Sequence, residues 1–140
     1  MKAYVDSDVI LDVLLGREYF LFESSQILQL CETQKIMGCT TVLALANMHY
    51  ILNRYDKKNA KKAIQTLRTI LTVMPISDHE MGRSLESDFK DFEDGVQNFT
   101  AEKNDCELII TRNKKDYATS QLNVVTPHEY LLQNTASLTF

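Results

Sequence analysis

Acidic side chains stand where strand patterns give way to helix patterns. Asp6 directly follows the apolar run Ala3–Val5, and Asp8 lies two residues further on. A carboxylate at the end of an apolar strand is costly unless a cation or a hydrogen-bond donor balances it. Either aspartate also suits a helix N-cap, because its oxygens accept hydrogen bonds from free backbone amides. We therefore expect a functional role at Asp6, and Asp8 is either a cap or a supporting residue.

A second acidic cluster lies at residues 88–94, where the sequence reads DFKDFED. Asp91 and Asp94 are three residues apart, so at the first turn of a helix their carboxylates point toward one side. A charge-rich helix start is the alternative interpretation. If the helix start lies at the same edge as Asp6, this cluster supplies a second set of acids.

A third polar segment, residues 111–116 with the sequence TRNKKD, follows a predicted strand. Its side chains should face Asp6 if the two strands are neighbours. The hydroxyl of Thr111 either orients a ligand or caps a turn, and Asp116 joins the candidate acids.

Three clusters of oxygen ligands without histidine or cysteine favour a hard cation, Mg²⁺ or Mn²⁺, over zinc. Such ions activate water and neutralise a scissile phosphate, which is the chemistry of metal-dependent nucleases. Neighbouring basic residues are candidates to contact flanking phosphates, or else are solvated surface charge. These are Arg17, Arg112, Lys114 and Lys115.

Five short apolar runs predict the strands that position these acids. They are Ala3–Val5, Ile36–Thr40, Val73–Ile76, Glu107–Thr111 and Asn123–Val125. Helical patterns alternate with them, which predicts an α/β three-layer sandwich around a mainly parallel sheet. In such sheets ligands bind beyond the carboxyl ends of the strands. The acidic clusters fall at those ends.

The helical patterns differ in how much of each helix they predict to be buried. Residues 41–54 are apolar nearly all round and predict a buried central helix that contains Asn47 and a packed His49. Residues 60–71 predict an amphipathic helix. Two further helices should begin at Ser77 and at Thr126, where a glutamate follows three residues later. Asp12 is expected to be a solvated or salt-bridged helix residue.

Composition favours one soluble domain over residues 1–140. Of the side chains, 44% are hydrophobic, and the formal net charge is −4. No apolar stretch is long enough to span a membrane, and the amino terminus lacks a signal-peptide core, so we expect a cytoplasmic protein. The three cysteines show no metal-binding spacing and are expected to be core residues. The acidic balance argues against a protein that grips nucleic acid over its whole surface.

Three motifs together resemble PIN domains, and the resemblance runs nearly end to end. The motifs are VDSDVILDVLL at residues 5–15, DFED at 91–94 and ITRNKKD at 110–116. PIN domains include the toxins of toxin–antitoxin pairs. The resemblance implies a Mg²⁺- or Mn²⁺-dependent endoribonuclease, RNA as substrate, a cognate antitoxin as partner and a homodimer.

The resemblance assigns roles to individual residues and shows two departures. Asp6 takes the place of the family's first acid and Asp94 that of its third. The acid of the central helix is replaced by Asn47, and the acid after the fourth strand by Asn113. Three further aspartates are candidates to restore the charge, with Asp91 and Asp116 as additional catalytic and metal-binding residues and Asp8 as a supporting one.

Three functions compete on this evidence. The first is a PIN ribonuclease, and the second is a PIN module that binds RNA or a protein partner without cleaving. The third is a hydrolase or phosphatase of another fold, which needs a nucleophile elbow or a glycine-rich phosphate loop. The four scattered glycines provide neither.

Overall fold

A single parallel sheet forms the centre of the molecule in the computed structural model, which describes residues 1–134. Its strand order is β3-β2-β1-β4-β5, and every neighbouring pair is parallel. The strands are β1 (Lys2–Val5), β2 (Met37–Thr41), β3 (Thr72–Met74), β4 (Leu108–Ile110) and β5 (Asn123–Val125). All five predicted strands are confirmed, and their bounds shift by no more than two residues.

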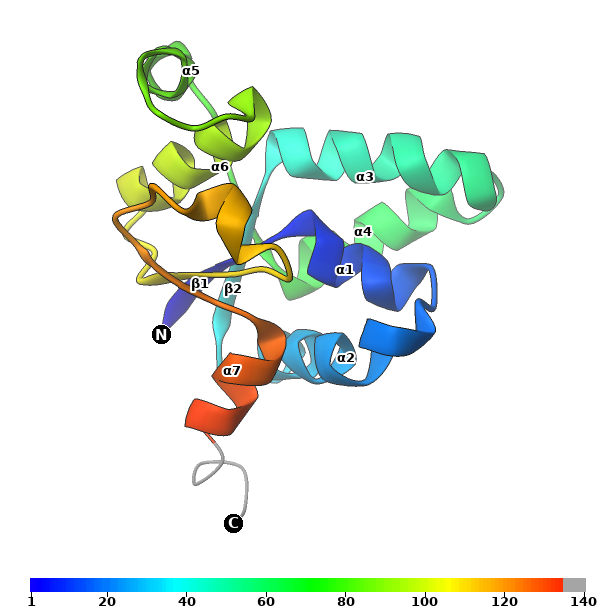
Figure 1. Cartoon of the computed structure of the whole chain (residues 1–140). Coiled ribbons are helices and arrows are strands. Elements are labelled where there is room, and N and C mark those ends of the chain that lie inside the picture. The colour runs from blue at the N-terminus through cyan, green and yellow to red at the C-terminus, as the bar shows by residue number, and fades with distance from the viewer. Residues whose placement is uncertain (135–140) are drawn as a thin grey trace.

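Helices cover both faces of this sheet and complete the predicted α/β sandwich (Figure 1). They are α1 (Ser7–Leu14), α2 (Glu18–Glu32), α3 (Val42–Tyr55), α4 (Ala60–Ile70), α5 (Asp78–Glu86), α6 (Phe92–Lys103), α7 (Pro127–Gln133) and the short 3₁₀ helix η1 (Lys114–Tyr117). No helix within residues 1–134 is long and apolar enough to cross a membrane.

The alternation of side chains along β1 divides the core into two parts. Ala3 and Val5 face the larger part, which the sheet forms with α1, α2, α3 and α4. Tyr4 faces the smaller part, together with Ala101 of α6 and Tyr117 of η1. Because successive strand residues point to opposite faces, Asp6 continues on the Tyr4 side. The first acid therefore stands on the face that α6 covers.

Helix α3 corrects one prediction. Its inner face is buried, as expected, but Val42 and Tyr50 are 49% and 67% exposed. The prediction of a helix buried all round was wrong because apolar character does not by itself require burial, and many surface positions carry apolar atoms. Asn47 belongs to α3 and lies half-buried near its first turns.

The other helix predictions agree with the structure. Capping boxes at Ser77 and Thr126 begin α5 and α7, and in each the glutamate three residues later accepts a hydrogen bond from the cap's backbone amide. Helix α4 is amphipathic, with Ala60 and Leu67 buried. The three cysteines are buried free thiols.

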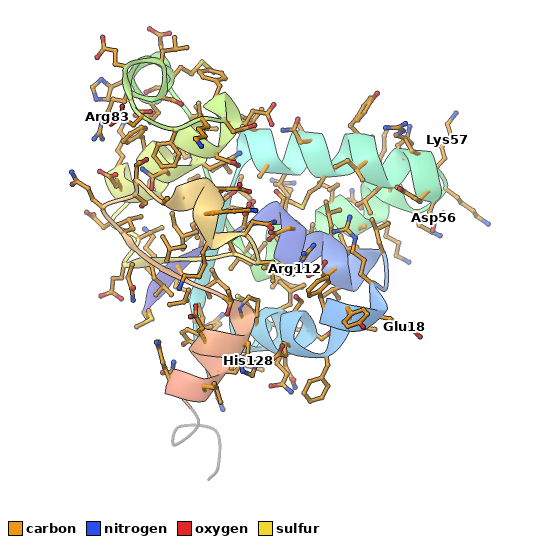
Figure 2. All side chains as sticks on the ribbon, viewed as in Figure 1. Glu18, Asp56, Lys57, Arg83, Arg112 and His128 are labelled. Atoms are coloured by element: carbon orange, nitrogen blue, oxygen red, sulfur yellow. The ribbon has the colours of Figure 1, made fainter. Side chains whose placement is uncertain are left out.

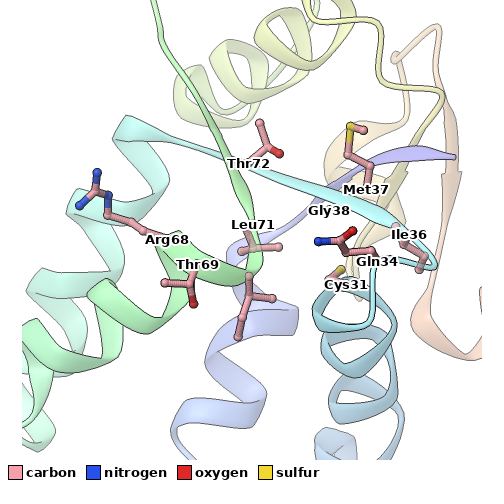
Figure 3. A pocket seen from close by; sticks show the side chains of 10 residues that line it. Cys31, Gln34, Ile36, Met37, Gly38, Arg68, Thr69, Leu71 and Thr72 are labelled. Carbon is pink, nitrogen blue, oxygen red and sulfur yellow. The ribbon is translucent and has the colours of Figure 1, made fainter.

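The amino ends of β2 and β3 border a pocket of about 460 Å³ (Figure 3). Gly38 is required beside it, because a Cβ there would lie 2.4 Å from the sulfur of Cys31 and 2.8 Å from a methyl of Leu71. The only charged side chain in its lining is that of Arg68. Because ligands of parallel sheets bind beyond the carboxyl ends of the strands, the acids at the opposite edge are the stronger candidate site.

Candidate active site

Neighbouring strand ends bring Asp6 and Thr111 together. Val5 of β1 pairs with Ile110 of β4, and the backbone amide of Asp6 donates to the carbonyl of Ile110 at 2.9 Å. The Thr111 hydroxyl then donates to Oδ2 of Asp6 at 2.7 Å. The prediction that the segment after β4 faces Asp6 is confirmed.

The carboxylate of Asp6 is also the N-cap of α1, since its Oδ1 accepts a hydrogen bond from the amide of Ser7 at 2.8 Å. No cation pairs with it among the residues described. Burial, followed by the negative charge of Asp8, raises the pKa of Asp6 to about 7, against the opposing effect of the Thr111 hydrogen bond. Asp6 is therefore a cap whose charge is only partly balanced.

Asp8 lies in the first turn of α1, so Asp6 and not Asp8 caps the helix. Its Oδ2 accepts hydrogen bonds from the side-chain amide of Asn113 at 2.8 Å and from the backbone amide of Arg112 at 3.3 Å. Its Oδ1 is buried and has no hydrogen-bond partner. Burial raises the pKa of Asp8, and the charge of Arg112 opposes that rise. Hydrogen bonds thus hold Oδ2 of Asp8 in place, while Oδ1 has no donor to stabilise its negative charge.

Asp94 enters the site from the first turn of α6. Asp91 caps this helix, and its Oδ1 accepts the backbone amide of Asp94 at 2.9 Å. Burial raises the pKa of Asp94 to about 7, followed by the negative charges of Asp91, Asp116 and Asp8. Asp94 thus joins the acids at the carboxyl edge of the sheet, and Asp91 has a structural role there as well.

A shallow cavity of about 290 Å³ connects the second and third clusters. Its charged lining consists of four aspartates and two lysines: Asp88, Asp91, Asp94, Asp116, Lys90 and Lys115. Asp116 belongs to η1 and is exposed. The cavity therefore brings together three of the four predicted acids, with Asp91 and Asp116 exposed at its rim. Asp6 is more deeply buried and does not line the cavity, but burial raises its pKa and the nearby charge of Asp94 adds to that rise.

The asparagines that replace two family acids both contact carboxylates. The side-chain amide of Asn47 donates to Oε2 of Glu93 at 3.1 Å, and that of Asn113 donates to Asp8 as described. Sequence reasoning missed Glu93. Its position beside Asp94 was a signal, but its contact with α3 is visible only in three dimensions.

Two tyrosines form the floor of the site and were also missed. Tyr4 and Tyr117 are 0% and 1% exposed, and their hydroxyls interact with each other. Burial first, and then neighbouring negative charge that includes Asp6, raises both pKa values well above the usual range. Tyr4 stands two residues before Asp6 on the same strand face, a spacing that is visible in the sequence.

The basic residues near the site are mostly engaged elsewhere. Arg112 lies against α1 (Figure 2). Its Nε is 2.7 Å from Oδ2 of Asp12, and its guanidinium lies over the ring of Phe20. Lys114 pairs with Glu129 at 3.1 Å. Lys115 lines the acidic cavity, so it is the best placed of the predicted RNA contacts.

Asp12 is buried and salt-bridged, one of the two alternatives expected for it. It is 0% exposed and receives Arg112, Arg17 at 3.3 Å and the hydroxyl of Ser24 at 3.0 Å. Arg17 is a candidate phosphate contact, but in the structure its guanidinium is paired with Asp12 of α1.

A divalent cation such as Mg²⁺ needs several oxygen ligands close together. Within residues 1–134, no three His, Cys, Asp or Glu side chains form a group that could hold a metal ion. The chemistry of the donors nevertheless fits a hard cation, because every one is an oxygen. The buried and unpartnered Oδ1 of Asp8 is an acceptor that such a cation would satisfy. Burial raises the pKa values of Asp6, Asp8 and Asp94, so these three acids would gain most from a nearby cation, although their carboxylates do not form a three-ligand group within the described chain.

Comparison with known proteins agrees with this fold. The PIN domain family model matches residues 2–115. Ribonuclease VapC1 of Aquifex aeolicus is 29% identical over 134 residues, which cover 92% of each chain.

Solved structures include two toxin–antitoxin assemblies of similar fold. A chain of a toxin–antitoxin complex from Klebsiella pneumoniae superposes with a TM-score of 0.69 at 25% identity, covering 89% of this chain and 97% of that one. A chain of VapBC2 from Rickettsia felis, bound to a DNA fragment from its promoter, gives a TM-score of 0.71 at 13% identity and covers 90% and 98%. The second likeness concerns the fold alone.

Proposed function

Because this chain belongs to the PIN domain family, we propose that it is a Mg²⁺- or Mn²⁺-dependent endoribonuclease that hydrolyses phosphodiester bonds in RNA. The similarity to Ribonuclease VapC1 supports this activity. The order of acids along the chain supports it as well, since strand ends and helix starts deliver them to one edge of the sheet.

The observation that carries the proposal is a set of buried carboxylates that protein cations do not balance. Asp6 and Asp94 both have pKa values raised to about 7, and Oδ1 of Asp8 has no donor. Isolated negative charge in a protein interior is costly, and buried charges are normally paired or coordinate metals. A divalent cation bound at a nuclease site would neutralise these carboxylates and remove the energetic cost of burying them.

The roles of the individual side chains follow from their positions. Asp6 and Asp94 would hold the cation, and Asp91 and Asp116 at the cavity rim would assist. The Thr111 hydroxyl fixes one oxygen of Asp6 at 2.7 Å and so sets the direction of its free lone pairs. Lys115 lines the same cavity and would contact a phosphate of the RNA. When bound, the divalent cation supplies activation of water and neutralisation of charge on the phosphate.

The biological setting that we propose is that of a toxin in a toxin–antitoxin pair. The fold shared with the Klebsiella complex supports a cognate antitoxin as partner. We further propose a homodimer that acts on RNA in the cytoplasm. Affinity purification of the tagged chain from its own cells, followed by size-exclusion chromatography with light scattering, tests both partner and dimer.

A PIN module that binds RNA or protein without cleaving it is the second candidate. The neutral side chains of Asn47 and Asn113, where the family usually has acids, favour it. Calorimetric titration with Mn²⁺ separates the two, because a module that has lost its metal site binds Mn²⁺ at best in the millimolar range.

Cleavage assays with Asp6→Asn test the enzyme directly. Wild-type protein should cleave single-stranded or structured RNA with Mn²⁺, and the variant should fall to the level of buffer because its direct ligand loses its charge. Asp78→Asn, an exposed change in the first turn of α5, is the matched control and should cleave as wild type does. Equal activity of wild type and Asp6→Asn would contradict the assignment.

A further inference from the structure

The asparagine of the central helix meets an acid from another helix. Asn47 of α3 donates its side-chain amide to Oε2 of Glu93 at 3.1 Å, and Glu93 belongs to the first turn of α6. An acid at position 47 would instead place two carboxylates in contact, which like charges disfavour. Asparagine at 47 and glutamate at 93 are therefore a matched pair. The negative charge at this contact is carried by α6.

The asparagine after β4 shows the same arrangement. Asn113 donates its side-chain amide to Oδ2 of Asp8 at 2.8 Å, and Asp8 belongs to α1. The other oxygen of Asp8 is buried without a hydrogen-bond partner. Here too the amide occupies the position of a family acid, and the carboxylate it contacts lies on a different element. An amide donates where an acid would repel, so each pair keeps one negative charge at the site.

The buried Oδ1 of Asp8 indicates a ligand at this edge. Buried polar groups are nearly always hydrogen-bonded, to protein or to an ordered ligand or water, and no donor of the described chain reaches this oxygen. The hydroxyls of Tyr4 and Tyr117 interact with each other, and burial, followed by negative charges that include those of Asp6, Asp8 and Asp94, raises the pKa values of both. The Oδ1 of Asp8 is therefore the atom at this edge that a bound cation would satisfy.

We propose that this chain relocates the two charges missing from Asn47 and Asn113 to Glu93 and Asp8, and that these two carboxylates contribute to divalent-cation binding. The carboxylates that we assign to the cation are then Asp6, Asp8, Glu93 and Asp94. The inference rests on the proposed function, since it concerns the same cation site. It replaces Asp91 and Asp116 as the main compensating acids, because Asp91 caps α6 and Asp116 is exposed at the rim.

Exchange of the charge between positions 47 and 93 tests the first pair. Calorimetric titration with Mn²⁺ alone should show roughly tenfold weaker binding for Glu93→Gln, the lower end of what supporting residues of metal sites contribute. The double variant Asn47→Glu/Glu93→Gln returns the acid to α3 and should recover most of the affinity. Glu107→Gln, an exposed glutamate just before β4 at the other edge of the sheet, is the matched control and should bind as wild type.

The outcomes separate this inference from the proposed function. Wild-type affinity in Glu93→Gln, with binding lost in Asp6→Asn, overturns the relocation and leaves the cation site standing. Absence of Mn²⁺ binding in the wild type overturns both. Thermal melts of each variant without Mn²⁺ show whether the fold is intact, and recovery in the double variant cannot result from a general loss of stability.

The second pair gives a parallel test. Asp8→Asn should weaken Mn²⁺ binding, and Asp8→Asn/Asn113→Asp should restore it by returning the acid to the segment after β4. A double variant that binds no better than Asp8→Asn would show that Asp8 contributes through its own position and not through relocated charge, and would overturn this half of the inference.

Discussion

Asp6 and Asp12 lie less than two helical turns apart and have opposite surroundings. Asp12 is fully buried and receives two arginines and a serine hydroxyl. Asp6 receives one hydroxyl and one backbone amide, and its strongest charged neighbour is another aspartate. A buried acid with cationic partners stabilises the fold, whereas one without them raises the energy of the fold. The contrast separates structural from functional carboxylates on one short segment.

Arg112 joins these two environments. Its side chain is held by Asp12 and by the ring of Phe20, while its backbone amide donates to Asp8 in the site. Asp12 therefore holds the segment after β4 in place through Arg112. From this segment Thr111 donates a hydrogen bond to Asp6 and Asn113 donates one to Asp8. The geometry of the site depends on the salt bridge behind it.

Loss of the negative charge of Asp12 should have the largest effect on stability. Asp12→Asn leaves Arg112 without its counter-charge and should lower the free energy of unfolding by about 3 kcal/mol, the lower end for breaking a buried pair, because Arg17 can turn to solvent. Urea denaturation measures the change. Asp78→Asn, at an exposed position, should cost far less, and similar losses in the two variants would contradict the contrast.

The neighbouring helices α5 and α6 repeat the comparison with Glu80 and Asp94. Glu80 is 1% exposed, its Oε2 accepts the amide and hydroxyl of Ser77 at 2.7 Å each, and Lys103 lies 3.2 Å from its Oε1. These partners outweigh burial and lower the pKa of Glu80 to about 2. The pKa of Asp94 instead rises to about 7. Here again the structural acid, Glu80, has hydrogen-bond donors and a cation beside it, whereas the pKa of Asp94 is raised by burial and by neighbouring acids.

Acid titration should show the second-largest effect. A lowered pKa means that Glu80 stabilises the fold fully above its ordinary value of 4.5 and progressively less as the pH falls toward 2. Glu80→Gln should therefore cost about 2 kcal/mol at pH 7, reduced by solvent around the exposed Lys103, and almost nothing near pH 2. Urea denaturation at several pH values measures this, and the exposed Glu86→Gln is the control. A loss that stays constant with pH would contradict an ionic origin.

The sequence permits prediction of the features that depend on local pattern. Continuous apolar runs predicted the strands, and the polar residues at their ends predicted that the segment after β4 faces Asp6 if the two strands are neighbours. The pairing and register of β1 and β4 come from the structure. The salt bridge of Asp12 was only one of two alternatives, because its partners lie 5, 12 and 100 residues away. Glu93 and the tyrosine floor were missed for the same reason. Whether an acid is balanced depends on elements that only folding brings together.

The smallest predicted effect is a gain in stability at Asp6, and its sign is the sharpest test of the comparison. Asp6→Asn removes a buried charge that lies beside Asp8, so in EDTA the variant should be about 1 kcal/mol more stable than wild type. Thermal melts measure this gain. Mn²⁺ should then reverse the order, because a ligand that binds only the folded wild type stabilises it by mass action while the variant gains little. An acid like Asp12 can show neither the gain nor the reversal, since its removal leaves an arginine unpaired. If Asp6→Asn is instead less stable than wild type in EDTA, Asp6 is a structural cap and the distinction between the two aspartates fails.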